Sequence, residues 1–360
     1  MKILYRYIFG QFAKAFFFSS LVFVSLFILI TAVERLDAIM DNHLTLLEVI
    51  RFFLLTIPAT LLITSPISTL LASILVSGKL SLSSELPAIR SAGVNMRQLL
   101  TPFLFGGLLI LGMNLLTAWW IAPAAFSETH LFEQRYYIKS DSRAKENQNI
   151  HLLEPGNKMV AIGNVDPDDY STLNLVSIEE FRGARVLSRI DASSMRYDKK
   201  EKVWIMRSAS TRVFTENNEA FRFEPSKSVK LALSPSSLKE LHLHPDEMDI
   251  IHHYRYLSEK QKAGLAGLEP SMVAFHTKTS MPFASLILIM IGVPLSAKKK
   301  RGGLASEITI SLFAGFLYLG LQKTVAMAGN QGAINPLLAA WLPNLLFLGI
   351  GYVIYKTTLD

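Results

Sequence analysis

The chain has 360 residues, of which half are hydrophobic and 18% are charged. It contains no cysteine, which excludes a disulfide framework and a thiolate metal site. The net charge is +7. The positions of lysine and arginine beside the apolar segments explain this charge better than binding of nucleic acid does, so no nucleic-acid partner is expected.

Long uncharged apolar stretches predict membrane-spanning helices, because about 20 helical residues cross the hydrocarbon core. In chain order they fall at 15–33, within 52–78 and 98–127, and at 279–297, 308–322 and 324–355. The last region is too long for one helix, and the turn residues AGNQGAINP (328–336) divide it. We predict six spans, three before residue 130 and three after residue 268.

The N-terminus, MKILYRYIFGQFAK, is basic and precedes an apolar run, as in a signal peptide. The run is too long for such a peptide, and no small-residue cleavage site precedes Glu34. An uncleaved first span is therefore expected.

The distribution of lysine and arginine predicts the orientation of these spans, because both residues favour the cytoplasmic side of short loops. With the N-terminus in the cytoplasm, the short outer loops hold only Arg35 and Arg51. The cytoplasmic segments hold eleven: Lys2, Arg6, Lys14, Lys79, Arg90, Arg97, Lys298, Lys299, Lys300, Arg301 and Lys356. Both termini are thus predicted to be cytoplasmic, and the middle of the chain lies outside.

Between the second and third spans lies a short charged insert, KLSLSSELPAIRSAGVNMRQLL (79–100). Ser83 or Ser84 is expected to cap a helix at about 82–92, with Glu85 in the first turn and Gly93 after its end. Such a helix would dock in a groove of a cytoplasmic partner through its face of Leu86, Ile89 and Arg90. The alternative is a surface helix that only orients the neighbouring spans.

Residues 130–262 carry charge and short alternating stretches such as KVWIMRS, in which Trp204 and Met206 share one face. Turn signals separate these stretches, which predicts an antiparallel sandwich or jelly roll. From about 246 to 262 the sequence is helical in character and leads back to the membrane. We expect three parts: 1–129 with spans one to three, an outer β domain at 130–262, and 263–360 with spans four to six.

The sequence contains no Walker A pattern, no G-x-S-x-G elbow and no H-E-x-x-H motif. His242 and His244 alternate as two metal ligands would on a strand, but no third ligand follows at a regular spacing. The chain is therefore expected to be non-catalytic and to bind no metal or cofactor itself.

Three stretches carry a more specific signal: SELPAIRSAG (84–93), IGVPLSAKKKRGG (291–303) and NPLLAAWLPNLLFLGIGYVIY (335–355). In this order, around three-plus-three spans and an outer β domain, they resemble the LptF/LptG family of lipopolysaccharide exporter permeases. MKILYRYI and ERLDAIMD (34–41) resemble the LptG members more than the LptF members.

The resemblance implies a non-catalytic subunit in the inner membrane of a Gram-negative bacterium. It implies an LptF-like second permease, an LptB-like ATPase dimer that binds ATP and Mg, an LptC-like protein, and an LptA-like periplasmic bridge. Lipopolysaccharide would be extracted from the membrane and passed to the periplasmic jelly roll and the bridge. The family's ATPase-coupling helix corresponds to these residues: Ser84, Glu85, Leu86, Ile89, Arg90, Ala92 and Gly93.

Some family members carry a lysine in the outer half of span 1, where this chain has Thr31, with Arg35 one turn further on. Arg35 and Lys323 are the expected substitutes for contact with lipid phosphates, or else they snorkel to headgroups.

Three other interpretations stay open. One is the LptF-type subunit of the same exporter. Another is a mechanotransmitting ABC subunit that moves no substrate, although such proteins typically have four spans. The third is a membrane enzyme or ion-coupled carrier, which the absence of charged pairs deep within the spans disfavours.

Overall fold

A computed structural model of the chain describes residues 2–136, 148–154, 156–165, 169–183, 185–215, 218–231, 233–235, 238, 244–262, 267–297 and 303–359. The chain separates into two compact units. The helical unit comprises Met1–Phe132, Pro245–His253 and Glu269–Asp360, and the strand unit comprises Glu133–His244 and Tyr254–Leu268. The predicted domain boundaries at 129/130 and 262/263 stay a prediction.

The helices before the strands are α1 (Lys2–Glu34), α2 (Leu36–Asp41), α3 (Leu46–Leu82), α4 (Glu85–Ser91), α5 (Met96–Leu116), the π-helix η1 (Thr117–Ile121) and α6 (Ala122–Tyr136). Those after the strands are the 3-10 helix η2 (Pro245–Glu247), α9 (Ile250–Lys262), α10 (Glu269–Ala297), α11 (Gly303–Asn330) and α12 (Pro336–Leu359). α9 agrees with the helix predicted at the end of the middle segment.

Among the described residues, six helical stretches are long and apolar enough to cross a membrane. Three precede the strands in the chain: α1, α3, and the run of α5 through η1 into α6. The other three are α10, α11 and α12. The six predicted spans are thus found, and the chain has the composition of a multi-pass membrane protein. A capping box at each start, Thr45 with Glu48 and Asn95 with Gln98, defines where α3 and α5 begin.

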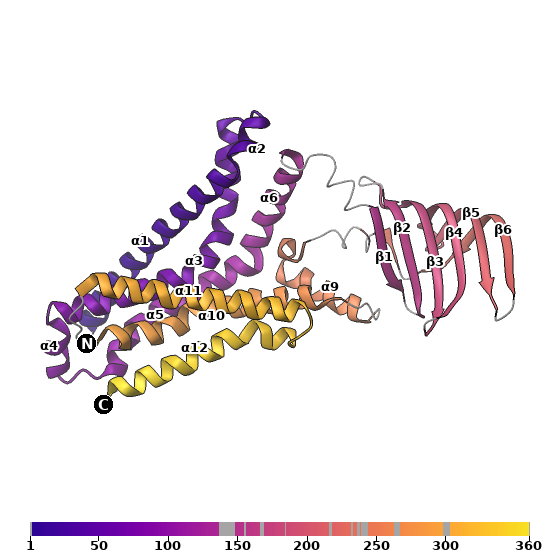
Figure 1. Ribbon diagram of the computed structural model, residues 1–360. Helices are drawn as coiled ribbons and strands as arrows, with labels where there is room; N and C mark the ends of the chain where they lie inside the picture. Colours follow the sequence, from indigo (N-terminus) through magenta and orange to yellow (C-terminus); the bar gives the residue numbers. More distant parts are fainter. Residues whose placement is uncertain are drawn as a thin grey trace. The chain divides into compact units, whose positions relative to one another are not determined.

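Helix α10 lies at the centre of the helical unit, packed against α3, α5, α11 and α12 (Figure 1). Its contact with α3 is close because small residues face each other there. A Cβ added at Gly292 of α10 would lie 2.1 Å from the Ser73 hydroxyl oxygen of α3. Small side chains of this kind let two membrane helices approach closely.

Polar side chains join the helices inside this unit. The Asn114 Nδ2 atom of α5 donates to Ser65 Oγ of α3 at 2.7 Å and to Ser285 Oγ of α10 at 3.3 Å. The two serine oxygens lie 3.2 Å apart, and all three side chains are buried. Since lipid offers no hydrogen bonds, polar groups within a bundle find their partners in one another.

The strand unit contains one antiparallel sheet whose strands follow each other in chain order, β1 to β6 (Figure 1). The strands are β1 (Gln148–Glu154), β2 (Lys158–Val165), β3 (Thr172–Arg182), β4 (Arg185–Asp198), β5 (Val203–Phe214) and β6 (Glu219–Val229). As predicted, Trp204 and Met206 are both buried on one face, whereas Ile205 is 36% exposed.

The described strands form a single meander, not the two facing sheets of a sandwich, so the jelly-roll prediction is not confirmed over these residues. Each strand pairs with the next one along the chain. Part of the apolar face is covered instead by Leu233 and Leu238, which pack in the same core. Both backbone polar groups of Leu233 are bonded: its N–H donates to Glu154 Oε1, and its carbonyl accepts from Trp204 Nε1, each at 2.7 Å.

In four neighbouring strands the alternation of buried residues shifts by one position at the same level of the sheet, and this shift is here called the step. In each of four strands two buried residues are spaced by three instead of two: Ile162 and Val165, Leu173 and Val176, Ala192 and Met195, Met206 and Ala209. The register is unchanged across the step, because Ile162 pairs with Val176 and Val165 pairs with Leu173. Leu175 and Ser208 lie on the step with φ of 53° each, in the left-handed region that non-glycine residues seldom adopt.

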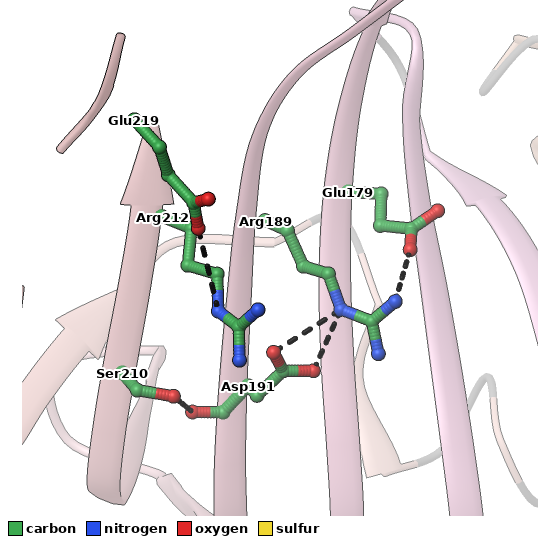
Figure 2. A network of polar contacts seen from close by, with 6 residues as sticks. All are labelled: Glu179, Arg189, Asp191, Ser210, Arg212 and Glu219. Atoms are coloured by element: carbon green, nitrogen blue, oxygen red, sulfur yellow. Dashed lines mark hydrogen bonds and ion pairs between the residues drawn. The ribbon is translucent and has the colours of Figure 1, made fainter. Parts of the chain in front are cut away.

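The face of the sheet opposite the apolar core carries charged residues from neighbouring strands (Figure 2). Arg189 of β4 lies 3.0 Å from a carboxylate oxygen of Glu179 in β3 and 2.9 Å from Asp191 in its own strand. The hydrogen bond to Asp191 raises the pKa of the Arg189 guanidinium.

Candidate functional site

Helix α4 occupies Glu85–Ser91, within the predicted range of about 82–92. Its N-cap residue Ser84 has a φ of 61° and makes no capping bond with its side chain, so the expected serine cap is absent there. The Ser83 hydroxyl instead donates to a carboxylate oxygen of Glu85 at 2.9 Å. At the other end Gly93 has a φ of 87° and donates its N–H to Arg90 O, which is the predicted glycine stop.

Leu86 is 2% exposed and packs with Leu80 and Met96 in the core of its own chain. It therefore holds α4 against the helical unit instead of presenting itself to a partner. Ile89 is partly exposed, and Pro87, Ala88, Arg90, Ser91 and Ala92 are exposed. Anchoring by one buried residue leaves most of the surface of α4 open.

Contacts at both ends of the chain hold the charged residues of α4. The Tyr7 hydroxyl of α1 donates to Glu85 at 3.2 Å, and Arg90 donates to the Thr358 carbonyl of α12 at 3.4 Å. The N-terminus, the C-terminus and α4 lie at one end of the helical unit (Figure 1). Glu85 is therefore a partly exposed carboxylate with a preset orientation, suited to receive a donor from outside the chain.

Thr31 and Arg35 lie one turn apart where α1 passes into α2, and the Arg35 N–H donates to Thr31 O at 3.0 Å. Both side chains are partly exposed, and Lys323 is exposed on α11. A role for these three in lipid contact stays a prediction.

The described residues contain no group of three histidine, aspartate or glutamate side chains that could hold a metal ion. His244 is exposed, and His242 lies outside the described residues. Four cations of the predicted cytoplasmic set also lie outside them: Lys298, Lys299, Lys300 and Arg301.

Lys278 was not among the predicted functional residues, because the fourth span was expected to begin at residue 279. In the structure α10 begins at Glu269, so Lys278 lies inside the span, partly buried. Its ammonium group donates to the Pro245 carbonyl at 2.8 Å and to the Met248 carbonyl. A single lysine within the otherwise uncharged stretch 270–297 was the signal that could have found it.

A family model described as "Lipopolysaccharide export system permease LptF/LptG" matches residues 6–357. The chain belongs to the LptF/LptG family. It is also similar to the lipopolysaccharide export system permease protein LptG of Haemophilus influenzae, with 21% identity over 345 residues that cover 95% of each chain. The LptF/LptG match includes the whole sheet and nearly all of the six candidate spans, so the family assignment applies to both units. The family is described as a permease of a lipopolysaccharide export system, so an LptF/LptG chain is a transport component.

Proposed function

We propose that this chain is the LptG-type subunit of an ABC exporter that extracts lipopolysaccharide from the inner membrane and passes it toward the outer membrane. The match to the family over nearly the whole chain carries the proposal, and the similarity to an LptG protein favours that subunit. The chain would pair with an LptF-type permease, with LptC- and LptA-like proteins as periplasmic acceptors. Both termini would be cytoplasmic and the strand unit periplasmic.

Co-purification separates the two subunit types. Tagged chain expressed with an LptF-type or an LptG-type partner should retain only the LptF-type one. Retention of only the LptG-type partner would assign this chain as the LptF-type subunit, and failure to bind either would contradict the proposed pairing. Release of lipopolysaccharide to an acceptor by the reconstituted complex, with ATP and Mg, tests the transport activity itself.

ATP hydrolysis would take place on a separate LptB-like dimer, with α4 as the joint through which it acts. The support is physical: α4 is short, mostly exposed, anchored by Leu86, and holds Glu85 in a set orientation. Removing one partner of a charged contact that is buried in an interface costs about 2–5 kcal/mol. Glu85→Ala and Glu85→Lys should therefore reduce retention of the ATPase at least about tenfold.

The matched control for this experiment is Glu201→Ala, because Glu201 is exposed in the turn between β4 and β5. Both Glu85 variants should insert in the membrane as the wild-type chain does. Normal retention and normal ATP turnover in both would remove α4 as the joint while leaving the family assignment untouched.

Thr31, Arg35 and Lys323 are the proposed contacts for the lipid phosphates. Arginine forms bidentate phosphate contacts that lysine cannot, so export should fall in the order wild type, Arg35→Lys, Arg35→Ala. Photocrosslinkers at the three positions should give lipopolysaccharide adducts that decline when ATP is added. A crosslinker at Leu317, which is 54% exposed on α11, is the control for bulk lipid. Adducts with phospholipid alone at all positions would show that the cations only snorkel.

A further inference from the structure

Residues Pro245–His253, here called the docked segment, belong to the helical unit although they lie between two stretches of the strand unit. Lys278 of α10 donates to two backbone carbonyls of this segment, those of Pro245 and Met248. Its electrostatic surroundings include Asp246 and Asp249 of the same segment. One ammonium group thus satisfies two carbonyls of the docked segment and is attracted by two of its carboxylates.

Two further polar contacts hold the docked segment. Glu247 Oε1 lies 2.7 Å from His130 Nδ1 of α6, and His253 Nε2 lies 2.9 Å from the Ser271 hydroxyl oxygen of α10. His253 is fully buried, and this burial lowers its pKa to about 3, so the ring is neutral at physiological pH. The Met248 side chain is 1% exposed. The segment is therefore held at three points by two helices.

The part of α10 that carries Lys278 is itself fixed by three other elements. Thr279 accepts from Trp119 of η1 at 3.4 Å, the Ser280 carbonyl accepts from Asn344 of α12 at 2.6 Å, and Ser285 lies 3.2 Å from Ser65 of α3. A displacement of this stretch of α10 would accordingly involve α3, which leads directly to α4.

A lysine within a membrane span costs about 2.5–3.5 kcal/mol at the centre of the bilayer, so simple packing would favour an apolar residue. Unlike an apolar residue, lysine can donate hydrogen bonds to the backbone carbonyls of another segment, whatever side chains that segment carries. The docked segment contains the first turn of α9, and α9 continues into the strand unit. The bond therefore links α10 to the beginning of a helix that extends beyond the helical unit.

We propose that Lys278 is a positioning residue that couples α10 to α9, so that displacement of α10 during transport is passed along α9 to the strand-bearing part of the chain. This inference rests on the proposed export function. It predicts that loss of the Lys278 bonds separates ATP hydrolysis from delivery of lipopolysaccharide, whereas a loss of folding would reduce both.

The test uses the complete reconstituted exporter with Lys278→Met, Lys278→Arg, and the control Lys200→Met, which removes an exposed lysine from the turn between β4 and β5. We expect Lys278→Met to lower delivery to the periplasmic acceptor at least tenfold while lipopolysaccharide-stimulated ATP hydrolysis stays within twofold of wild type. Lys278→Arg, which keeps a charged donor, should restore part of the delivery. The control should match wild type.

A spin label gives a second measurement that does not depend on transport. The chain has no native cysteine, so Ile251→Cys, at an exposed position of α9, provides a unique attachment point. Its mobility should increase in Lys278→Met, or in Lys278→Gln if the Met variant fails to insert.

Unchanged delivery with an unchanged label would overturn the coupling role, as would an equal loss of hydrolysis and delivery. Failure of the wild-type complex to deliver lipopolysaccharide would instead refute the export function.

Discussion

The helical unit and the strand unit place their polar groups in opposite positions. In the helical unit, Asn114 and Ser285 are hydrogen-bonded inside, and large apolar side chains such as Phe18 lie outside. In the strand unit, Trp204 is fully buried and the charged Arg189 lies on the open face. One chain is thus built for two solvents, lipid around the helices and water around the sheet.

Among the variants that test this contrast between the two units, Trp204→Ala is expected to lower stability the most. It removes a fully buried indole and its bond to Leu233, and such substitutions cost about 3–5 kcal/mol. Hydrogen exchange of the β2–β5 amides should accelerate about 100-fold or more, with the helical unit unaffected. Ile205→Ala, on the other face of the same strand, should have little effect. Equal destabilisation of both units by Trp204→Ala would show that they are not separate.

The converse change is Gly292→Val, which adds a branched side chain where α10 is in close contact with α3. The new Cβ would lie 2.1 Å from Ser73 Oγ and 3.1 Å from the Leu70 side chain, so the helices must move apart. Overpacking typically costs about 1–3 kcal/mol. The thermal midpoint of the helical circular dichroism signal should fall in detergent. Gly320→Val is the control, since nothing lies within 4 Å of a Cβ there. Equal shifts for the two variants would reject the close contact.

Asn114→Ala tests whether polar contacts inside the helical unit stabilise it. Hydrogen bonds between membrane helices contribute about 0.6 kcal/mol on average and at most about 1.7 kcal/mol. A double-mutant cycle with Ser65→Ala should give a coupling free energy in this range, because the two side chains share a 2.7 Å bond. A coupling free energy of zero would mean that the buried bond adds nothing to stability.

The smallest effect is expected from Arg189→Met on the open face of the sheet. Exposed ion pairs contribute about 0.2–1 kcal/mol, and salt screens them. The loss of stability of the strand unit should therefore shrink when the salt concentration is raised, whereas the Asn114–Ser65 coupling should not change. A loss that persists at high salt would show that the aliphatic part of Arg189 matters through packing.

The six spans could be predicted from the sequence because apolar length is a direct requirement of the bilayer. The same holds for the helix at Glu85–Ser91 and its end at Gly93, where local signals decide the structure. The burial of Leu86 could not be predicted, since it depends on Met96 and Leu80 meeting in space. The spacing of apolar residues identifies a helix face, but it does not show whether that face packs against the same chain or against a partner.

The sheet shows a second limit of sequence reasoning. Alternation correctly paired Trp204 with Met206 on one face, but the buried set changes phase at Ser208. No glycine or proline marks that phase change within β5, so no clear signal for it is present in the sequence. Lys278 stands out in the sequence as a lone lysine, but its partners are backbone carbonyls, which the sequence does not reveal.

The step across the sheet also restricts where insertions and deletions can occur during evolution. Because the four strands shift phase at the same level, register survives only if each strand keeps its extra residue. Losing one residue beside Leu175 would turn half of β3 over, placing apolar side chains in water and polar ones in the core. Insertions and deletions between homologous sheets are therefore expected in the turns, such as the one around Lys200, while the four stepped strands are inherited as a set.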